Sequence, residues 1–117
     1  MTEKTNPRML KVWREVNLQT VRSHEPDLTS RQMSILLCVY MTDPPHTVRG
    51  LSAELNVTKP VITRGLDTMG RLGLIKRKRD ENDKRSVLIQ RTVKGAVFLS
   101  ELSDRIVEAD KAIAPDD

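Results

Sequence analysis

The feature of the sequence that most constrains the fold is a change of periodicity at Gly73. Between residues 47 and 71, apolar residues recur every three or four positions, which is the spacing of an amphipathic helix. After Gly73, two strand-like runs at 74–79 and 86–91 flank a polar segment at 80–85, which predicts a β-hairpin. The sequence therefore predicts a mainly α chain that carries one small β-hairpin, an α+β fold.

The helical stretch before Gly73 divides into two short helices. Thr47 can cap the first helix, the pair Asn56-Val57 supplies a tight turn, and Thr58 can cap the second helix. The second helix turns an apolar stripe inward and leaves a short, polar or basic face outward, made of Lys59, Pro60, Val61, Thr63 and Arg64. Two helices joined by so short a turn, with a hairpin after them, predict a winged helix-turn-helix.

Helices are also predicted before and after this region. The first helix is predicted at 7–24, where apolar residues recur at helical spacing: Met9, Trp13, Val16 and Val21. The last helix is predicted at 92–113, with Thr92 as its cap. Its apolar residues recur at alternating steps of three and four: Leu99, Leu102, Ile106, Ala109 and Ile113. Thr29 and Gln32 fit a capping box that opens a further helix, whose apolar run predicts a buried position.

A chain of 117 residues suits one core, so we expect a single domain at 1–117. Its central part is expected at 28–91, including the wing at 74–91, between the flanking helices at 7–24 and 92–113.

Basic residues are concentrated in the middle of the chain. The whole sequence carries a formal net charge of +4. Residues 46–95 contain twelve Lys and Arg against five Asp and Glu, a local charge of +7, which leaves −3 for the remainder. Such a basic middle suits a surface that binds a polyanion. Charge alone fits DNA, RNA or a solvated face, so the motifs have to decide.

The remaining residue types argue against other classes of function. Cys38 is the only cysteine, and His24 and His46 lack a paired-ligand spacing, so we expect no disulfide, no metal and no cofactor. Cys38 is predicted to be a core residue rather than a redox switch. The sequence holds neither a glycine-rich phosphate loop nor a nucleophile with its base, so an enzyme is not expected. It also lacks a bilayer-spanning apolar run and a signal peptide, so we expect a cytoplasmic, nucleoid-associated protein.

From about residue 28 to residue 95, the chain resembles the MarR family of winged helix-turn-helix transcriptional regulators. The most specific match is the wing pattern Asp-x-x-Asp-x-Arg at residues 80–85, followed at the family's distance by the segment 92–95, Thr-Val-Lys-Gly. The segment 58–64 and the exit at 73–75 also look like the family's. Three such matches in order imply a sequence-specific regulator that binds double-stranded DNA, and the family favours a repressor.

The resemblance implies how the DNA contacts are divided. The helix that begins near Lys59 is expected to enter the major groove, while Arg85 reaches the neighbouring minor groove and is held by Asp83. The residues expected in or beside the major groove are Thr58, Lys59, Pro60, Val61, Thr63 and Arg64. The other basic residues of the wing are expected to contact phosphates: Lys76, Arg77, Lys78, Arg79 and Lys84.

We also expect a homodimer on a pseudo-palindromic operator, because one short recognition helix rarely gives enough specificity alone and two-fold pairing places two such helices about one DNA turn apart. The terminal helices are expected to form the dimer. The chain ends at Asp117, roughly one helix earlier than family members with interleaved terminal helices, so a short member without the last C-terminal helix is expected. Gly65 and Gly70 predict a softer or more closely packed recognition helix. Arg91 stands where the family usually has an apolar residue.

Two alternatives stay open. A winged-helix module can bind an acidic protein partner, and a basic winged helix can also bind DNA without sequence preference as an architectural protein. Salt dependence and sequence dependence separate these functions from a regulator. The sequence assigns no small-molecule effector.

Overall fold

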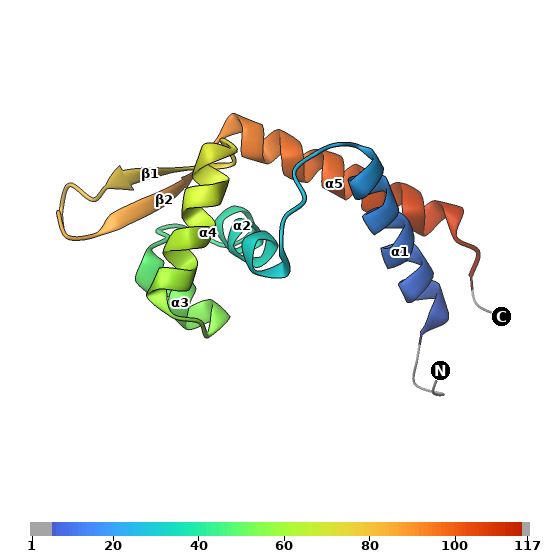
Figure 1. Cartoon of the computed structure of the whole chain (residues 1–117), viewed down its shortest axis with the longest axis horizontal. Coiled ribbons are helices and arrows are strands. Elements are labelled where there is room, and N and C mark those ends of the chain that lie inside the picture. Colours follow the sequence, from blue (N-terminus) through green and yellow to red (C-terminus); the bar gives the residue numbers. More distant parts are fainter. Residues whose placement is uncertain (1–5, 116–117) are drawn as a thin grey trace. The chain divides into compact units, whose positions relative to one another are not determined.

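The computed structural model describes residues 6–115 and contains five helices and one antiparallel hairpin (Figure 1). In chain order the elements are α1 (Pro7–Arg22), α2 (Ser30–Met41), α3 (Val48–Leu55), α4 (Lys59–Arg71), β1 (Ile75–Arg79), β2 (Val87–Arg91) and α5 (Val93–Ala112). The predicted mainly α fold with one hairpin is therefore confirmed. No helix within 6–115 has both the length and the hydropathy to cross a bilayer.

The chain separates into two compact units. Unit 2 contains residues 28–98, and unit 1 joins the segment up to residue 27 with the segment from residue 99 onward. The expectation of one domain over the whole chain stays a prediction.

The core of unit 2 lies between α2, α4 and the hairpin. The fully buried side chains of unit 2 are Ile35, Leu36, Val39, Ile62, Leu66, Met69 and Leu74. Helix α2 begins at the predicted capping box, in which Thr29 Oγ1 accepts from the Gln32 N–H at 3.1 Å and the Gln32 side chain accepts from the Thr29 N–H at 2.9 Å. This reciprocal cap satisfies two N–H groups at the helix start, so the apolar run behind it can be buried.

Tyr40 joins the end of α2 to both ends of the hairpin. Its phenolic oxygen donates to the carbonyl of Leu74 at 2.6 Å and accepts from the N–H of Thr92 at 2.9 Å. Gly95 lies directly against this junction, because a Cβ there would overlap the Tyr40 hydroxyl and the Leu74 carbonyl. Thr92 caps α5 as predicted, since its hydroxyl accepts from the Gly95 N–H at 2.9 Å. The 92–95 segment is therefore a packing motif that fixes where the hairpin passes into α5.

Arg91 has a structural role that explains its polar character. Its Nε donates to the carbonyl of Val39 and its Nη2 donates to the carbonyl of Thr42, both at 2.9 Å. The guanidinium also lies 5.9 Å from the centre of the Tyr40 ring. Carbonyls at the C-terminal end of a helix have no intrahelical partner, and Arg91 supplies donors to this end of α2.

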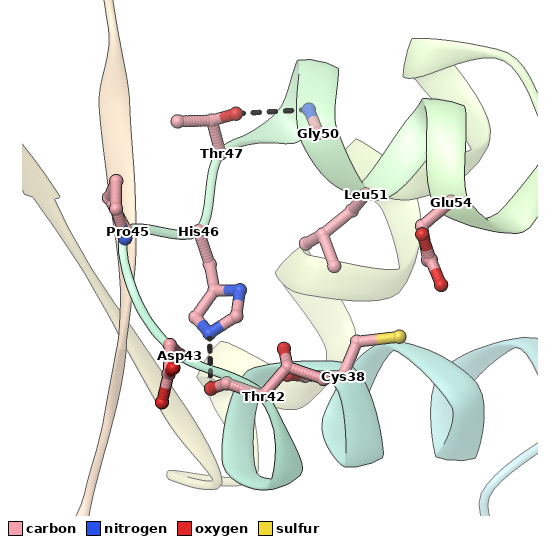
Figure 2. A pocket seen from close by; sticks show the side chains of 9 residues that line it. All are labelled: Cys38, Thr42, Asp43, Pro45, His46, Thr47, Gly50, Leu51 and Glu54. Atoms are coloured by element: carbon pink, nitrogen blue, oxygen red, sulfur yellow. Dashed lines mark hydrogen bonds between the residues drawn. The ribbon is translucent and has the colours of Figure 1, made fainter.

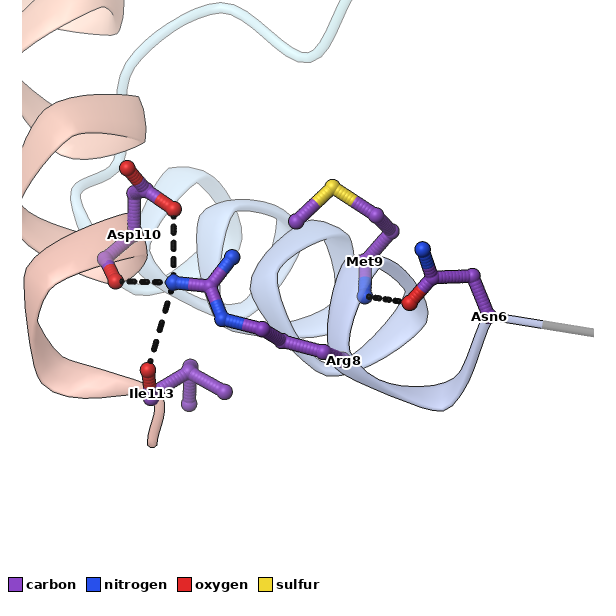
Figure 3. Close-up of polar contacts among 5 residues, drawn as sticks. All are labelled: Asn6, Arg8, Met9, Asp110 and Ile113. Carbon is purple, nitrogen blue, oxygen red and sulfur yellow. Dashed lines mark hydrogen bonds and ion pairs between the residues drawn. The ribbon is translucent and has the colours of Figure 1, made fainter. Parts of the chain in front are cut away.

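Unit 1 is held together by few contacts between α1 and the C-terminal part of α5. Its buried residues are Val12, Val16 and Ala109, against which pack the partly buried Leu102 and Ile113. Arg8 ties the two segments, because its Nη2 donates to the carboxylate and to the carbonyl of Asp110, both at 2.7 Å, and to the carbonyl of Ile113 at 3.3 Å (Figure 3).

The predicted apolar faces of the terminal helices are only partly correct. In α1, Val12 is buried together with Val16, whereas three of the predicted residues are exposed by 45 to 65%: Met9, Trp13 and Val21. In α5, Ile106 is exposed by 40%. The spacing of three and four is satisfied by more than one face of a helix, and the packing of α1 on α5 selects a different one. Helix α1 also ends at Arg22, with His24 at a positive φ of 62° beyond it.

Candidate nucleic-acid interface

Helix α4 is anchored on its inner side and leaves its first turns accessible. Ile62, Leu66 and Met69 have no exposed surface, which fixes the rotation of the helix. The opposite face carries five exposed residues and the half-buried Val61; the exposed ones are Thr58, Lys59, Pro60, Thr63 and Arg64. The structure therefore places the predicted recognition residues on one accessible face of α4.

The cap of α4 differs from the prediction in one detail. Thr58 occupies the N-cap position, but its side chain makes no capping hydrogen bond. The Thr58 carbonyl instead accepts from the Val61 N–H at 3.1 Å, a tight first turn that already satisfies this donor. Pro60 lies in the same turn, where its missing N–H costs nothing. Within the described residues, the Thr58 hydroxyl is not used as a cap.

The two glycines of α4 have different surroundings. A Cβ on Gly65 would lie 3.0 Å from the Cδ1 of Ile35, so this glycine allows α4 to approach α2 closely. A Cβ on Gly70 would meet only ordinary contacts, at 3.8 Å from Arg77 Nη2 and 3.9 Å from Ile75 Cδ1. The prediction of a more closely packed helix is thus met at Gly65, and Gly70 has no steric requirement.

The wing tip is organised by the two aspartates of the sequence motif. Asp80 accepts from the Asn82 N–H at 2.9 Å, and Asp83 Oδ1 accepts from the Arg85 N–H at 3.1 Å. The Ser86 N–H closes the turn on the Asp83 carbonyl at 2.9 Å. Each carboxylate accepts from the backbone N–H two residues along, which is the hydrogen bonding of an Asx turn. The spacing of the motif is therefore explained by the path of the loop.

Arg85 projects from this ordered loop. Its side chain is 94% exposed, and its Nε lies 3.6 Å from Asp83 Oδ1. At this distance and exposure the ion pair restrains the guanidinium weakly, whereas the hydrogen bond to the Arg85 N–H fixes the backbone that carries it. Asp83 acts mainly on the position of the Arg85 backbone.

The basic side chains of β1 divide between two faces of the hairpin. Arg77 pairs with Ile89 and follows Ile75 by two positions, so it lies on the same face of the hairpin as these two buried residues. Lys76 and Lys78 lie on the opposite face. Arg77 Nη2 lies 2.8 Å from the carboxylate of Asp67 in α4. Of the wing cations, Arg77 is thus already paired with the recognition helix.

A cavity brings Lys59 and Arg85 together with a residue that the sequence reasoning missed, Arg49. The cavity has a volume of about 340 Å³, and its lining consists of Thr47, Val48, Arg49, Lys59, Arg85, Ser86 and Val87. No acidic residue lines it. Arg49 is the second residue of α3, just after the Thr47 cap, and this position in the basic middle of the chain is the signal that could have identified it. The lining does not include five other residues that the sequence predicted to contact DNA: Thr63, Arg64, Lys78, Arg79 and Lys84.

A second cavity, of about 260 Å³, lies between the end of α2 and α3 and has a different chemical character (Figure 2). It is lined by Cys38, Asp43, His46 and Glu54 among others, and His46 Nε2 donates to the Thr42 carbonyl at 3.2 Å. Cys38 was predicted to be a core residue but is half-buried here. Burial, and then the charge of Glu54, raise the pKa of the Cys38 thiol. Within residues 6–115, no cluster of His, Cys, Asp and Glu can hold a metal ion.

The two-helix turn, the accessible face of α4 and the ordered basic wing define a DNA-binding winged helix. Residues 28–87 match the model of the MarR family, and the chain belongs to this family. The family consists of transcriptional regulators, so the fold is that of a DNA-binding regulator.

Solved structures agree with this fold. A MepR mutant from S. aureus is 21% identical, with a TM-score of 0.76 over 95% of this chain and 80% of that one. The transcriptional repressor CouR bound to a 23-mer DNA duplex is 23% identical, with a TM-score of 0.70 over 90% and 71%. A mutant of MarR from E. coli is 25% identical, with a TM-score of 0.68 over 92% and 80%. No curated protein matches the chain in sequence.

Proposed function

We propose that the protein is a sequence-specific transcriptional repressor that binds double-stranded DNA as a homodimer. The observation that carries this proposal is the juxtaposition of the accessible face of α4 with an ordered wing whose Arg85 is 94% exposed. The structure of the repressor CouR bound to a DNA duplex supports it by analogy, because its fold is similar. We expect the protein to be associated with the nucleoid.

The recognition helix enters the major groove in this proposal. Arg64 and Lys59 donate to guanine or to phosphates, Thr63 bonds either, and Val61 touches a thymine methyl. Thr58 and Pro60 lie at the start of the helix and approach the DNA backbone. Because Ile62, Leu66 and Met69 fix the rotation of α4, these side chains are presented without reordering of the helix.

The wing enters the neighbouring minor groove. A guanidinium is favoured by the negative potential of a narrow minor groove, and the Asp83 carboxylate holds the loop that carries Arg85. Lys76, Lys78, Arg79 and Lys84 are exposed and contact phosphates, which position the protein without reading sequence. Arg77 contributes less to the phosphate contacts because Asp67 already engages it.

Unit 1 supplies the dimer interface in this proposal. Five apolar side chains of unit 1 are exposed by 40 to 57%: Met9, Leu10, Trp13, Ile106 and Val107. In addition, Nε and Nη2 of Arg105 are buried without a hydrogen-bond partner in the described part of the chain. A second copy would cover the apolar side chains and offer an acceptor to the guanidinium, which is costly to bury unpaired.

Genomic footprinting followed by salt titration on the best site tests the proposal. A dimer with about 6 to 10 phosphate contacts should lose a factor of ~10³ to 10⁵ in affinity between 50 and 200 mM salt. A scrambled site should bind far more weakly, and Arg85→Ala should weaken binding most where the minor groove is narrow. Equal affinity for the true and scrambled sites would favour an architectural protein, and no footprint would favour a protein-binding module.

A further inference from the structure

The charged residues that line the cavity containing Arg49 are all cations. Three of its lining residues are cations, from three separate elements: Arg49 in α3, Lys59 at the start of α4, and Arg85 at the end of the wing loop. Among the described residues, Arg49 and Lys59 have no ion pair, and Arg85 has only the 3.6 Å pair with Asp83. Cations that converge without a carboxylate repel one another, so the cavity favours an anion.

A backbone donor adds to these cations. Thr47 Oγ1 accepts from the Gly50 N–H at 3.0 Å, which satisfies the third N–H of α3. The N–H of Arg49, the second residue of the helix, has no acceptor within α3, whereas the N–H of Val48 faces β2 at the bridge between Thr47 and Leu88. The Arg49 N–H lies at the positive end of the helix and beside the three cations, so the cavity offers both charge and a directed hydrogen bond to an anionic oxygen.

We propose that this cavity holds one backbone phosphate of the DNA and that Arg49 is a DNA-positioning residue. The inference rests on the proposed function. A sugar-phosphate strand separates the major groove from the adjacent minor groove, so a protein with α4 in one groove and its wing in the other must straddle that strand. The cavity lies between Lys59 and Arg85, which is where the strand has to pass. The phosphate thus links the reading of the two grooves.

This role makes Arg49 different from a residue that reads bases. A phosphate contact carries no sequence information, so Arg49 contributes equally to true and scrambled sites. Each cation that neutralises a phosphate adds about 0.9 to the slope of log affinity against log salt. Because Arg49 is exposed and unpaired in the described residues, its replacement is not expected to change the stability of the fold.

A salt titration of the full chain on its best DNA site tests the charge. In the proposed homodimer Arg49→Ala removes one cation from each protomer, so it should lower the slope by about 1.8 relative to the unchanged protein. Arg31→Ala removes the same charge from an exposed position in α2 that does not line the cavity, and it should leave the slope unchanged. Equal slopes for Arg49→Ala and the unchanged protein would overturn the proposal, as would an equal loss in both variants.

A scan with single neutral methylphosphonate linkages tests the shared phosphate. One linkage in each half-site should weaken the unchanged protein, and at that linkage Arg49→Ala and Lys59→Ala should cause little further loss. If each variant loses as much affinity at every linkage as on unmodified DNA, the proposal is wrong. Failure of the unchanged protein to bind any DNA would instead refute the proposed function, so the two failures are distinguishable.

Discussion

The two units of the molecule differ in how completely they bury their apolar surface. In unit 2, α2, α4 and the hairpin enclose a continuous core, and Tyr40 joins segments 34 and 52 residues apart with hydrogen bonds to Leu74 and Thr92. In unit 1, the buried cluster consists of Val12, Val16 and Ala109. Two helical segments with so small a core gain little free energy to offset the entropy of ordering the chain.

This difference predicts that unit 2 can fold alone, whereas unit 1 gains stability in the proposed dimer. Unit 2 has a buried core and a capped α2, so we expect it to fold independently. Unit 1 leaves Trp13, Ile106 and Val107 exposed, so its stability should increase when a second copy covers them. DNA binding and dimer formation should therefore be separable by mutation.

The largest effect is expected at Gly95 in unit 2. Gly95→Ala places a Cβ onto the Tyr40 hydroxyl and the Leu74 carbonyl, and backbone cannot yield as a flexible side chain does. We expect a loss of about 3 kcal/mol or more in the free energy of unfolding, measured by urea denaturation. Gly70→Ala is the matched control, because its Cβ meets no close contact and alanine favours a helix by up to about 1 kcal/mol. Equal stability of the two variants would contradict this account of Gly95.

A smaller, more local effect is expected in unit 1. Val16 is 1% exposed and Val21 is 65% exposed on the same helix. Val16→Asp buries a charge and should abolish the ordered α1, with a local cost of at least about 2 kcal/mol, whereas Val21→Asp should leave α1 ordered. Amide hydrogen exchange of α1 measures this directly, and protection of α2 and α4 should persist in both variants. Loss of protection in α2 and α4 would show that the two units are not separable.

The same pair of variants sharpens the proposed dimer. Val16→Asp should sediment as a monomer, because the helix that carries the exposed apolar residues is lost. Trp13 is the only tryptophan and is 57% exposed in the single chain, so its emission should shift to shorter wavelength as the unchanged protein dimerises. A monomer at all concentrations, free and on DNA, would refute the dimer.

Within unit 2, the two faces of β1 should contribute unequally to DNA binding. Lys78→Ala removes an exposed cation from each protomer of the proposed dimer and should lower the salt slope by about 1.8, with equal loss on all sequences. Arg77→Ala should change the slope less, because Asp67 holds the guanidinium at 2.8 Å. Salt titrations of both variants on one site provide the comparison. An equal decrease in slope would place Arg77 on a phosphate.

The smallest effect concerns Cys38. Burial, and secondly the charge of Glu54, raise the pKa of its thiol above the ordinary value of 9.0. The folded state therefore keeps the proton at a pH where the unfolded chain has lost it, so any contribution to stability is complete below pH 9.0 and is lost as the pH rises through the raised pKa. Alkylation by iodoacetamide at pH 8 should be slower in the folded protein than in urea, and faster in Glu54→Gln. A folded rate equal to that in urea would exclude this environment.

Features set by neighbouring residues were predictable from the sequence. The caps at Thr29, Thr47 and Thr92 and the aspartates of the wing depend on hydrogen bonds that span two to three residues. The family pattern at residues 80–85 is likewise local, since its acids accept from the loop that contains them. Such interactions are encoded wherever the residue types occur at the right spacing.

The tertiary structure decided what depends on residues far apart in the chain. The sequence allowed several apolar faces on α1, and packing selected Val12 and Val16. The sequence predicted a phosphate contact for both Arg77 and Lys78, whereas the structure shows that Arg77 forms an ion pair with Asp67. Arg49 was not singled out, because its position beside Lys59 and Arg85 exists only once α3, α4 and the wing are folded together. Spacing along a helix or strand determines which residues share a face, and only long-range packing determines what that face meets.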